Sequence, residues 1–212
     1  MNLLDIVLHL DTHLLKLVAD YGLWVYAILF AIIFSETGFV VTPFLPGDSL
    51  LFVAGAIAAS GQLSASALFV ALTAAAILGN SVNYAIGRWL GGHFFTDRGS
   101  RWLNPGHLEK AHAFYEKHGG KAVVISRFLP IVRTYVPFVA GMARMGAREY
   151  LAYNAAGAVL WVGTLTYAGF FFGNIPWIRG NLTAIIVAIV VVSLLPLVYA
   201  YAKSRRSPRP RP

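Results

Sequence analysis

Arginine and proline interrupt an apolar segment that reads Ser126-Arg-Phe-Leu-Pro-Ile-Val-Arg-Thr-Tyr-Val-Pro-Phe-Val-Ala-Gly141. An arginine at the centre of a bilayer costs about 2.5–3.5 kcal/mol on insertion scales, so such residues usually face partners or water. Pro130 and Pro137 remove backbone donors and rule out one smooth helix. Broken backbone at membrane depth persists only where protein buries it or where it lines a wet cavity. The segment therefore predicts a structural charge pair, a short soluble loop between spans, or an anion site.

An earlier segment of the chain repeats two short motifs of this one, and this repeat favours the anion site. Phe44-Leu-Pro46 returns as Phe128-Leu-Pro130, and Phe52-Val-Ala-Gly55 returns as Phe138-Val-Ala-Gly141. Paired, interrupted hydrophobic segments in the two halves of a chain point to the central site of a transporter. The charges of the two copies are complementary: Glu36 and Asp48 in the first copy, Arg127 and Arg133 in the second.

Composition indicates a single integral membrane domain. The chain has 212 residues, of which 58% are hydrophobic and only 12% charged, and it has no cysteine. The net charge of +8 could suggest nucleic acid. The basic residues lie beside apolar segments, however, which indicates membrane topology and contact with anionic membrane lipids instead.

Apolar periodicity predicts an all-α membrane domain over 1–203 with two re-entrant helical hairpins and about three transmembrane helices. Spanning needs about 20 residues, and the apolar arms around the first polar bend are shorter. One conventional span over 21–42 is the alternative. In chain order we expect an amphipathic helix (1–20), hairpin 1 (21–61), a transmembrane helix (63–90), a cytoplasmic stretch with a surface helix (91–120), hairpin 2 (121–146), two further transmembrane helices (150–173 and 180–201) and a disordered basic tail (203–212). The expected hairpin bends are Pro43, Pro46 and Gly47 in the first copy, and Pro130 and Pro137 in the second.

The positive-inside rule gives the orientation. Most Lys and Arg residues fall on one side of the membrane if both hairpins are re-entrant. The stretch 91–120 and the C-terminus are therefore expected in the cytoplasm, with the first hairpin opening to the outside and the N-terminal helix also outside.

Further polar side chains are candidates for a secondary pocket. Asn80, Asn83 or Tyr84, and Gly87 share one helical face, and Arg88 ends the same helix. Hydrogen bonding between helices explains this face as well as substrate contact does. Arg88 can also extend to the interface as an ordinary anchor.

No metal or cofactor site is predicted. His9 and His13 have the i, i+4 spacing of a metal pair but no third ligand, so a solvated polar face explains them better. Faces of small residues on the apolar helices permit a homodimer without requiring one.

Several motifs together resemble the DedA family of bacterial inner-membrane proteins. The resemblance implies two opposed re-entrant hairpins in an inverted-repeat arrangement and a multi-pass protein of the inner membrane. It also implies transport or scrambling of lipid carriers linked to the proton motive force, with recycling of undecaprenyl phosphate as the best-defined role and phospholipid scrambling as another. The motifs are Glu36-Thr-Gly, Phe44-Leu-Pro-Gly-Asp48, Asn83-Tyr84-x-x-Gly-Arg88 and Arg127-Phe-x-Pro-x-x-Arg133.

By position, the acidic residues that the family requires match Glu36 and Asp48, and its required arginines match Arg127 and Arg133. Relatives often have Asp where this chain has Asn80, so the resemblance leaves a third membrane carboxylate without a counterpart here.

These residues suggest a mechanism in which Arg127 and Arg133 grip a lipid phosphate, since guanidinium groups match phosphate oxygens in a bidentate way. Glu36 and Asp48 would neutralise the arginines when the site is empty, and one of them could take up a proton as phosphate arrives. We expect a transporter or flippase of a phosphate-bearing lipid.

Rival functions remain open at this point. They are a scramblase of phosphatidylethanolamine, a cation/proton antiporter that uses the same carboxylates, and a structural protein whose buried ion pairs join Glu36 to Arg127 and Asp48 to Arg133. An enzyme is not expected, because the membrane region contains no His and no Gly-x-Ser-x-Gly motif.

Overall fold

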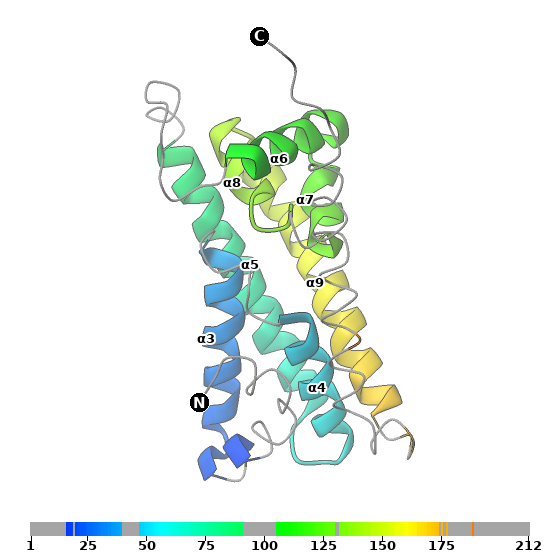
Figure 1. Cartoon of the computed structure of the whole chain (residues 1–212). Coiled ribbons are helices and arrows are strands. Elements are labelled where there is room, and N and C mark those ends of the chain that lie inside the picture. Colours follow the sequence, from blue (N-terminus) through cyan, green and yellow to red (C-terminus); the bar gives the residue numbers. More distant parts are fainter. Residues whose placement is uncertain are drawn as a thin grey trace.

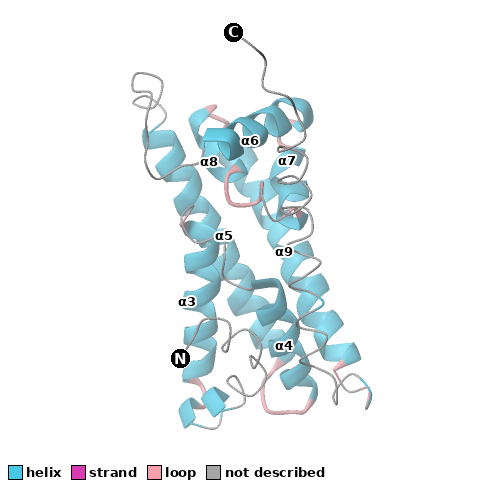
Figure 2. Ribbon diagram, viewed as in Figure 1, coloured by secondary structure: helices cyan, strands magenta, loops and turns pink. Residues whose placement is uncertain are grey.

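The regular structure of this chain is helical. The computed structural model describes residues 16–18, 20–39, 47–90, 105–129, 132–173, 175, 177 and 188, and all elements in these ranges are helices (Figure 2). The all-α prediction is thereby confirmed for the described part. Nearly all of the expected amphipathic helix at 1–20 and of the span at 180–201 lies outside the described residues. So do the tail at 203–212 and the bend residues Pro43, Pro46 and Pro130.

Two helices, α5 (Ala65–Leu90) and α9 (Ala147–Phe172), are long and apolar enough to cross a bilayer. Each has 26 residues, which corresponds to about 39 Å of helix against about 30 Å of hydrocarbon. The hydroxyl of Ser64 accepts a hydrogen bond from the Ala67 amide at 3.3 Å, as an N-cap does, and this fixes where α5 begins. These helices lie where spans are expected at 63–90 and 150–173.

The remaining helices are shorter, and most of them lie against α5 or α9. In the first half these are α3 (Trp24–Gly38) and α4 (Gly47–Ala59), each shorter than a bilayer span. In the second half, α6 (Pro105–His118) begins at a proline, a residue that is favoured in the first turn of a helix. This helix is followed by α7 (Lys121–Ile125), the 3-10 helix η1 (Ser126–Phe128) and α8 (Val136–Met142). Unlike the others, α6 packs on α7 and α8. Figure 1 shows α4 beside the lower halves of α5 and α9, and α6, α7 and α8 at their upper ends.

Two residues expected at hairpin bends lie in the first turns of helices. Gly47 is the first residue of α4, and Pro137 is in the first turn of α8. A proline in a first turn costs nothing in hydrogen bonding, because the first helical N–H groups have no partner within the helix. Pro137 therefore starts a helix, where the sequence suggested that it bends the chain.

Each half of the chain packs on both long helices. The first short apolar helix of each half lies on the long helix that follows it in the chain: α3 packs on α5, and α7 packs on α9. The second short apolar helix of each half packs mainly on the long helix of the other half: α4 lies on α9, and α8 lies on α5.

Glycines bring α4 into backbone contact with α9, and α8 into backbone contact with α5, with similar geometry at both contacts. At the α4–α9 contact, a Cβ on Gly55 would lie 2.0 Å from the Thr166 carbonyl oxygen, and one on Gly169 would lie 1.9 Å from the Phe52 carbonyl oxygen. At the α8–α5 contact, a Cβ on Gly141 would lie 2.1 Å from the Tyr84 carbonyl oxygen, and one on Gly87 would lie 2.1 Å from that of Phe138. Helix packing thus explains the repeated Phe-Val-Ala-Gly motif. Its glycine permits close approach of the long helix, and its phenylalanine carbonyl faces a glycine of that helix.

Replacing Gly169 by Ala should destabilise the protein by about 1–3 kcal/mol, because the new methyl group meets backbone atoms that can move only by separating α4 from α9. Gly163→Ala on the same helix is the matched control, since its methyl group would meet only the Phe69 ring, at 3.3 Å. Thermal unfolding of the purified variants in detergent measures the difference. Equal midpoints for the two variants would contradict the close contact.

Candidate functional site

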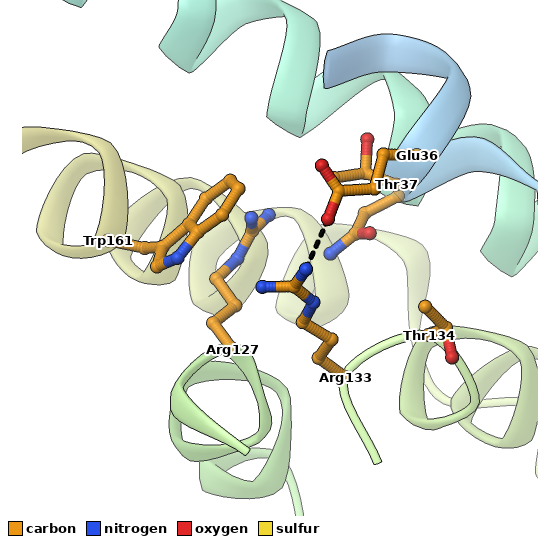
Figure 3. Close-up of a pocket in the computed structure, with 7 residues that line it drawn as sticks. Glu36, Thr37, Arg127, Arg133, Thr134 and Trp161 are labelled. Carbon is orange, nitrogen blue, oxygen red and sulfur yellow. Dashed lines mark hydrogen bonds and ion pairs between the residues drawn. The ribbon is translucent and has the colours of Figure 1, made fainter. Parts of the chain in front are cut away.

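Charged and polar side chains meet in a small cavity about halfway along α5 and α9. The cavity has a volume of about 10 Å³, which is room for one water molecule. Figure 3 shows Arg127 and Arg133 entering from one side and Glu36 from the other. The lining residues are Glu36, Thr37, Asn80, Arg127, Arg133, Thr134 and Trp161.

Arg133 binds both carboxylates that the sequence singles out. Its Nη1 donates to Asp48 Oδ1 at 2.8 Å. Its Nη2 donates to Glu36 Oε1, the contact that Figure 3 marks with a dashed line. One guanidinium group therefore joins α3 to α4 and both to the loop before α8. Two charge-assisted hydrogen bonds from separate nitrogens are the arrangement that a phosphate group would also accept.

Glu36 is buried beside Gly47, and this neighbour explains why position 47 has no side chain. A Cβ at position 47 would lie 1.8 Å from Glu36 Oε2. At the start of α4, Gly47 thus leaves room for the Glu36 carboxylate, and the next residue, Asp48, supplies the second carboxylate. The Asp48 side chain is 20% exposed.

Arg127 is only 4% exposed, and it has no carboxylate partner in the described part of the chain. Neutral acceptors surround it instead. Its Nη2 donates to Asn154 Oδ1 at 2.6 Å and to the Ala76 carbonyl at 3.3 Å, and its guanidinium carbon lies 5.8 Å from the centre of the Trp161 ring. The expected ion pair between Glu36 and Arg127 therefore does not form. Arg133 binds both carboxylates, and Arg127 is a cation surrounded by neutral groups.

Two asparagines complete that shell. The amide of Asn154 in α9 also donates to the Ile77 carbonyl at 3.0 Å and to Ser81 Oγ at 3.3 Å, which ties α9 to α5. With its amide oriented to form both hydrogen bonds, Asn80 donates to the Thr37 carbonyl at 3.1 Å and accepts from Arg127 at 3.0 Å. Asn80 thus lines the cavity, as a pocket residue should.

The other three secondary-pocket candidates lie outside the cavity lining. Asn83 is fully buried, and its amide donates to the Thr134 carbonyl at 2.8 Å and to the Thr37 carbonyl at 3.4 Å, so it connects the two halves. The Tyr84 hydroxyl donates to the Met145 carbonyl, and the Arg88 guanidinium donates to that hydroxyl at 2.9 Å. Tyr84 and Arg88 therefore brace the α5 end against the α8–α9 turn.

Sequence reasoning gave no role to four residues of the site. Asn154 and Trp161 contact the charged side chains, and Thr37 and Thr134 line the same cavity. Asn154 offered the clearest signal, because a lone asparagine in an apolar span usually has a specific partner. Trp161 offered none, since tryptophan is ordinary in an apolar helix. Within the described ranges, no group of three or more metal-ligand side chains occurs.

Two helices long and apolar enough to cross a bilayer enclose a buried cluster of charged side chains, as expected of an integral membrane protein. Residues 45–171 match the VTT domain model. The chain belongs to the DedA family.

Relatives support this assignment along nearly the whole chain. The chain is 54% identical to Protein DedA of Escherichia coli K12 over 97% of its own length and 94% of that protein. It is 42% identical to an uncharacterized membrane protein of Mycobacterium leprae, over 83% of this chain and 79% of that one. It is 39% identical to Inner membrane protein YqjA of Escherichia coli K12, over 71% of this chain and 69% of that one. No solved structure matches the chain.

Proposed function

We propose that this protein carries a phosphate-bearing lipid across the bacterial inner membrane, with undecaprenyl phosphate as the first candidate substrate. The observation that carries the proposal is a buried guanidinium, Arg127, which has no carboxylate partner in the described ranges and lies beside Arg133, whose two carboxylates can be exchanged for phosphate oxygens. An anionic headgroup supplies the charge that Arg127 lacks. It also offers Arg133 acceptors of the same geometry.

The proposed path uses two opposed re-entrant hairpins, α3 with α4 and α7 with α8, related as inverted repeats. Two features support this arrangement: α3 and α4 are too short to span, and the two glycine contacts match. The apolar tail would remain in the bilayer while the headgroup crosses between the hairpin tips. With the C-terminus in the cytoplasm, the basic stretch 91–120 faces the same side.

Proton coupling fits the same site. If the phosphate takes the donors of Arg133, Glu36 and Asp48 lose a cationic partner, and uptake of a proton by one of them removes an otherwise unpaired buried charge. Lipid and proton then move together, with no metal or cofactor and no chemical conversion of the lipid. The partners of the protein are then the lipid, the surrounding membrane and protons.

The deciding experiment is reconstitution of the purified chain into liposomes with labelled undecaprenyl phosphate and, in parallel, labelled phosphatidylethanolamine, each with and without a pH gradient. We expect protein-dependent movement of the phosphate lipid between leaflets, accelerated by the gradient. Movement of phosphatidylethanolamine at the same rate without a gradient would replace the proposal by a scramblase. Proton flux without any added lipid would replace it by an antiporter.

Exchanging the partners of the observed ion pair separates transport from a structural role. We expect the double variant Glu36→Arg with Arg133→Glu to recover much of the thermal stability lost in either single variant, but to transport at least about tenfold more slowly than wild type, because Asp48 then faces Glu instead of Arg. Thermal unfolding and liposome transport are measured on all four proteins. Recovery of both properties would favour ion pairs that only hold the fold.

A further inference from the structure

Trp161 is the one aromatic side chain in the cavity lining, and it contacts three of the four charged residues of the site. Its indole Nε1 donates to Asp48 Oδ1 at 2.9 Å. The centre of its ring lies 5.8 Å from the guanidinium carbon of Arg127 and 5.5 Å from that of Arg133 (Figure 3). The side chain is buried, so these contacts and not solvent fix its position.

The Asp48 contact is the informative one, because a single oxygen is shared. Asp48 Oδ1 accepts from Trp161 Nε1 and also from Arg133 Nη1 at 2.8 Å. The guanidinium belongs to the loop before α8, whereas the indole belongs to α9, which lies directly against α4. An indole N–H is a donor only and cannot ionise, so this hydrogen bond is available whatever Arg133 binds.

The ring face adds a second effect. Arg127 and Arg133 carry like charges and approach the same indole, whose π face attracts cations. The ring therefore offsets part of the repulsion between the two guanidinium groups and fixes their separation. A Phe ring would keep this effect but lose the N–H, so the two contributions can be separated by mutation.

We propose that Trp161 is a positioning residue for lipid transport, whose indole N–H holds Asp48 in place while the phosphate occupies Arg133 and so keeps the carboxylate ready for the return of that arginine. Glu36 has no second side-chain donor of this kind in the described part of the chain. Asp48 is the more exposed of the two acids, so a fixed donor from α9 limits its rotation toward water when Arg133 leaves it. This inference rests on the proposed function.

The test compares Trp161→Phe with Trp24→Phe, the same change at a residue of α3 that is 71% exposed. In liposomes with labelled undecaprenyl phosphate, we expect Trp161→Phe to slow transport about tenfold, the value of one hydrogen bond to a charged group, and Trp24→Phe to transport as wild type does. Trp161→Leu, which also loses the ring face, should be slower still. Equal rates for wild type and Trp161→Phe overturn the inference while leaving the proposed function intact. A wild-type protein that moves no phosphate lipid overturns both.

A spectroscopic measurement separates positioning from mere packing. In a chain in which the other four tryptophans, Trp24, Trp89, Trp102 and Trp177, are replaced by Phe, all indole fluorescence comes from Trp161. We expect undecaprenyl phosphate to shift its emission, because a guanidinium leaves the ring face while Asp48 remains bonded, and we expect no shift with a neutral polyprenol. An emission that does not respond to the phosphate lipid contradicts the proposal, even if Trp161→Phe fails to fold.

Discussion

Lysine in place of Arg133 should slow lipid transport by roughly 10- to 100-fold, although the charge of the site does not change. Arg133 reaches Asp48 with one nitrogen and Glu36 with another, and a single ammonium nitrogen cannot hold both carboxylates, or two phosphate oxygens, in the same plane. The loss of one charge-assisted hydrogen bond accounts for the range. Initial rates of phosphate-lipid movement in liposomes measure it.

Arg148→Lys is the matched control, because Arg148 is an exposed arginine near the start of α9 and should tolerate lysine. Transport by Arg133→Lys at the control rate would show that charge alone is enough, and bidentate binding would be abandoned. Glu36→Gln should behave differently, retaining a neutral acceptor for Arg133 but failing to respond to a pH gradient if Glu36 carries the proton.

Replacing Asn154 by Leu should destabilise the protein by about 3 kcal/mol, with a fall in the unfolding midpoint of about 10 °C. Leucine has a similar size, but it removes the closest acceptor of the buried Arg127 guanidinium and the donor to the Ile77 carbonyl. Burying a cation with fewer acceptors is costly, since water cannot replace them there. Thermal unfolding in detergent measures the change.

Thr164→Leu tests the same substitution type at an exposed position of the same helix, and we expect it to unfold as the wild type does. Asn154→Asp is the complementary variant. It offers Arg127 the carboxylate that it lacks, so it should retain the fold much better than Asn154→Leu. A stable Asn154→Leu protein would mean that Arg127 does not depend on Asn154.

The long helices could be predicted from the sequence because strong local signals mark them. Both apolar stretches exceed a bilayer span, so the predicted bounds 63–90 and 150–173 agree with the observed bounds of α5 and α9 within about three residues. The four charged residues could be nominated for the same kind of reason, since charge inside an apolar segment is rare.

Partner choice in the site could not be predicted in this way. Glu36 and Arg133 are 97 positions apart, and both arginines were equally good partners until the packing of α8 on α5 and of α4 on α9 brought one of them to the acids. Nor does any local pattern reveal that Asn154 faces Arg127 or that Trp161 faces Asp48, because those contacts join α9 to other helices. Nor could the sequence place Pro137 in the first turn of α8, directly after the turn at residues 132–135, because a proline marks a helix start as readily as a bend.

The small volume of the cavity between α5 and α9 limits how many lipids the proposed transporter moves in one cycle. A space that admits a single water cannot admit a phosphate group, so under the proposed function the arginines and carboxylates must part each time a headgroup enters and meet again after it leaves. We therefore expect turnover to saturate with lipid concentration and to proceed one molecule per cycle, as in a carrier, with no continuous stream of lipid through an open furrow.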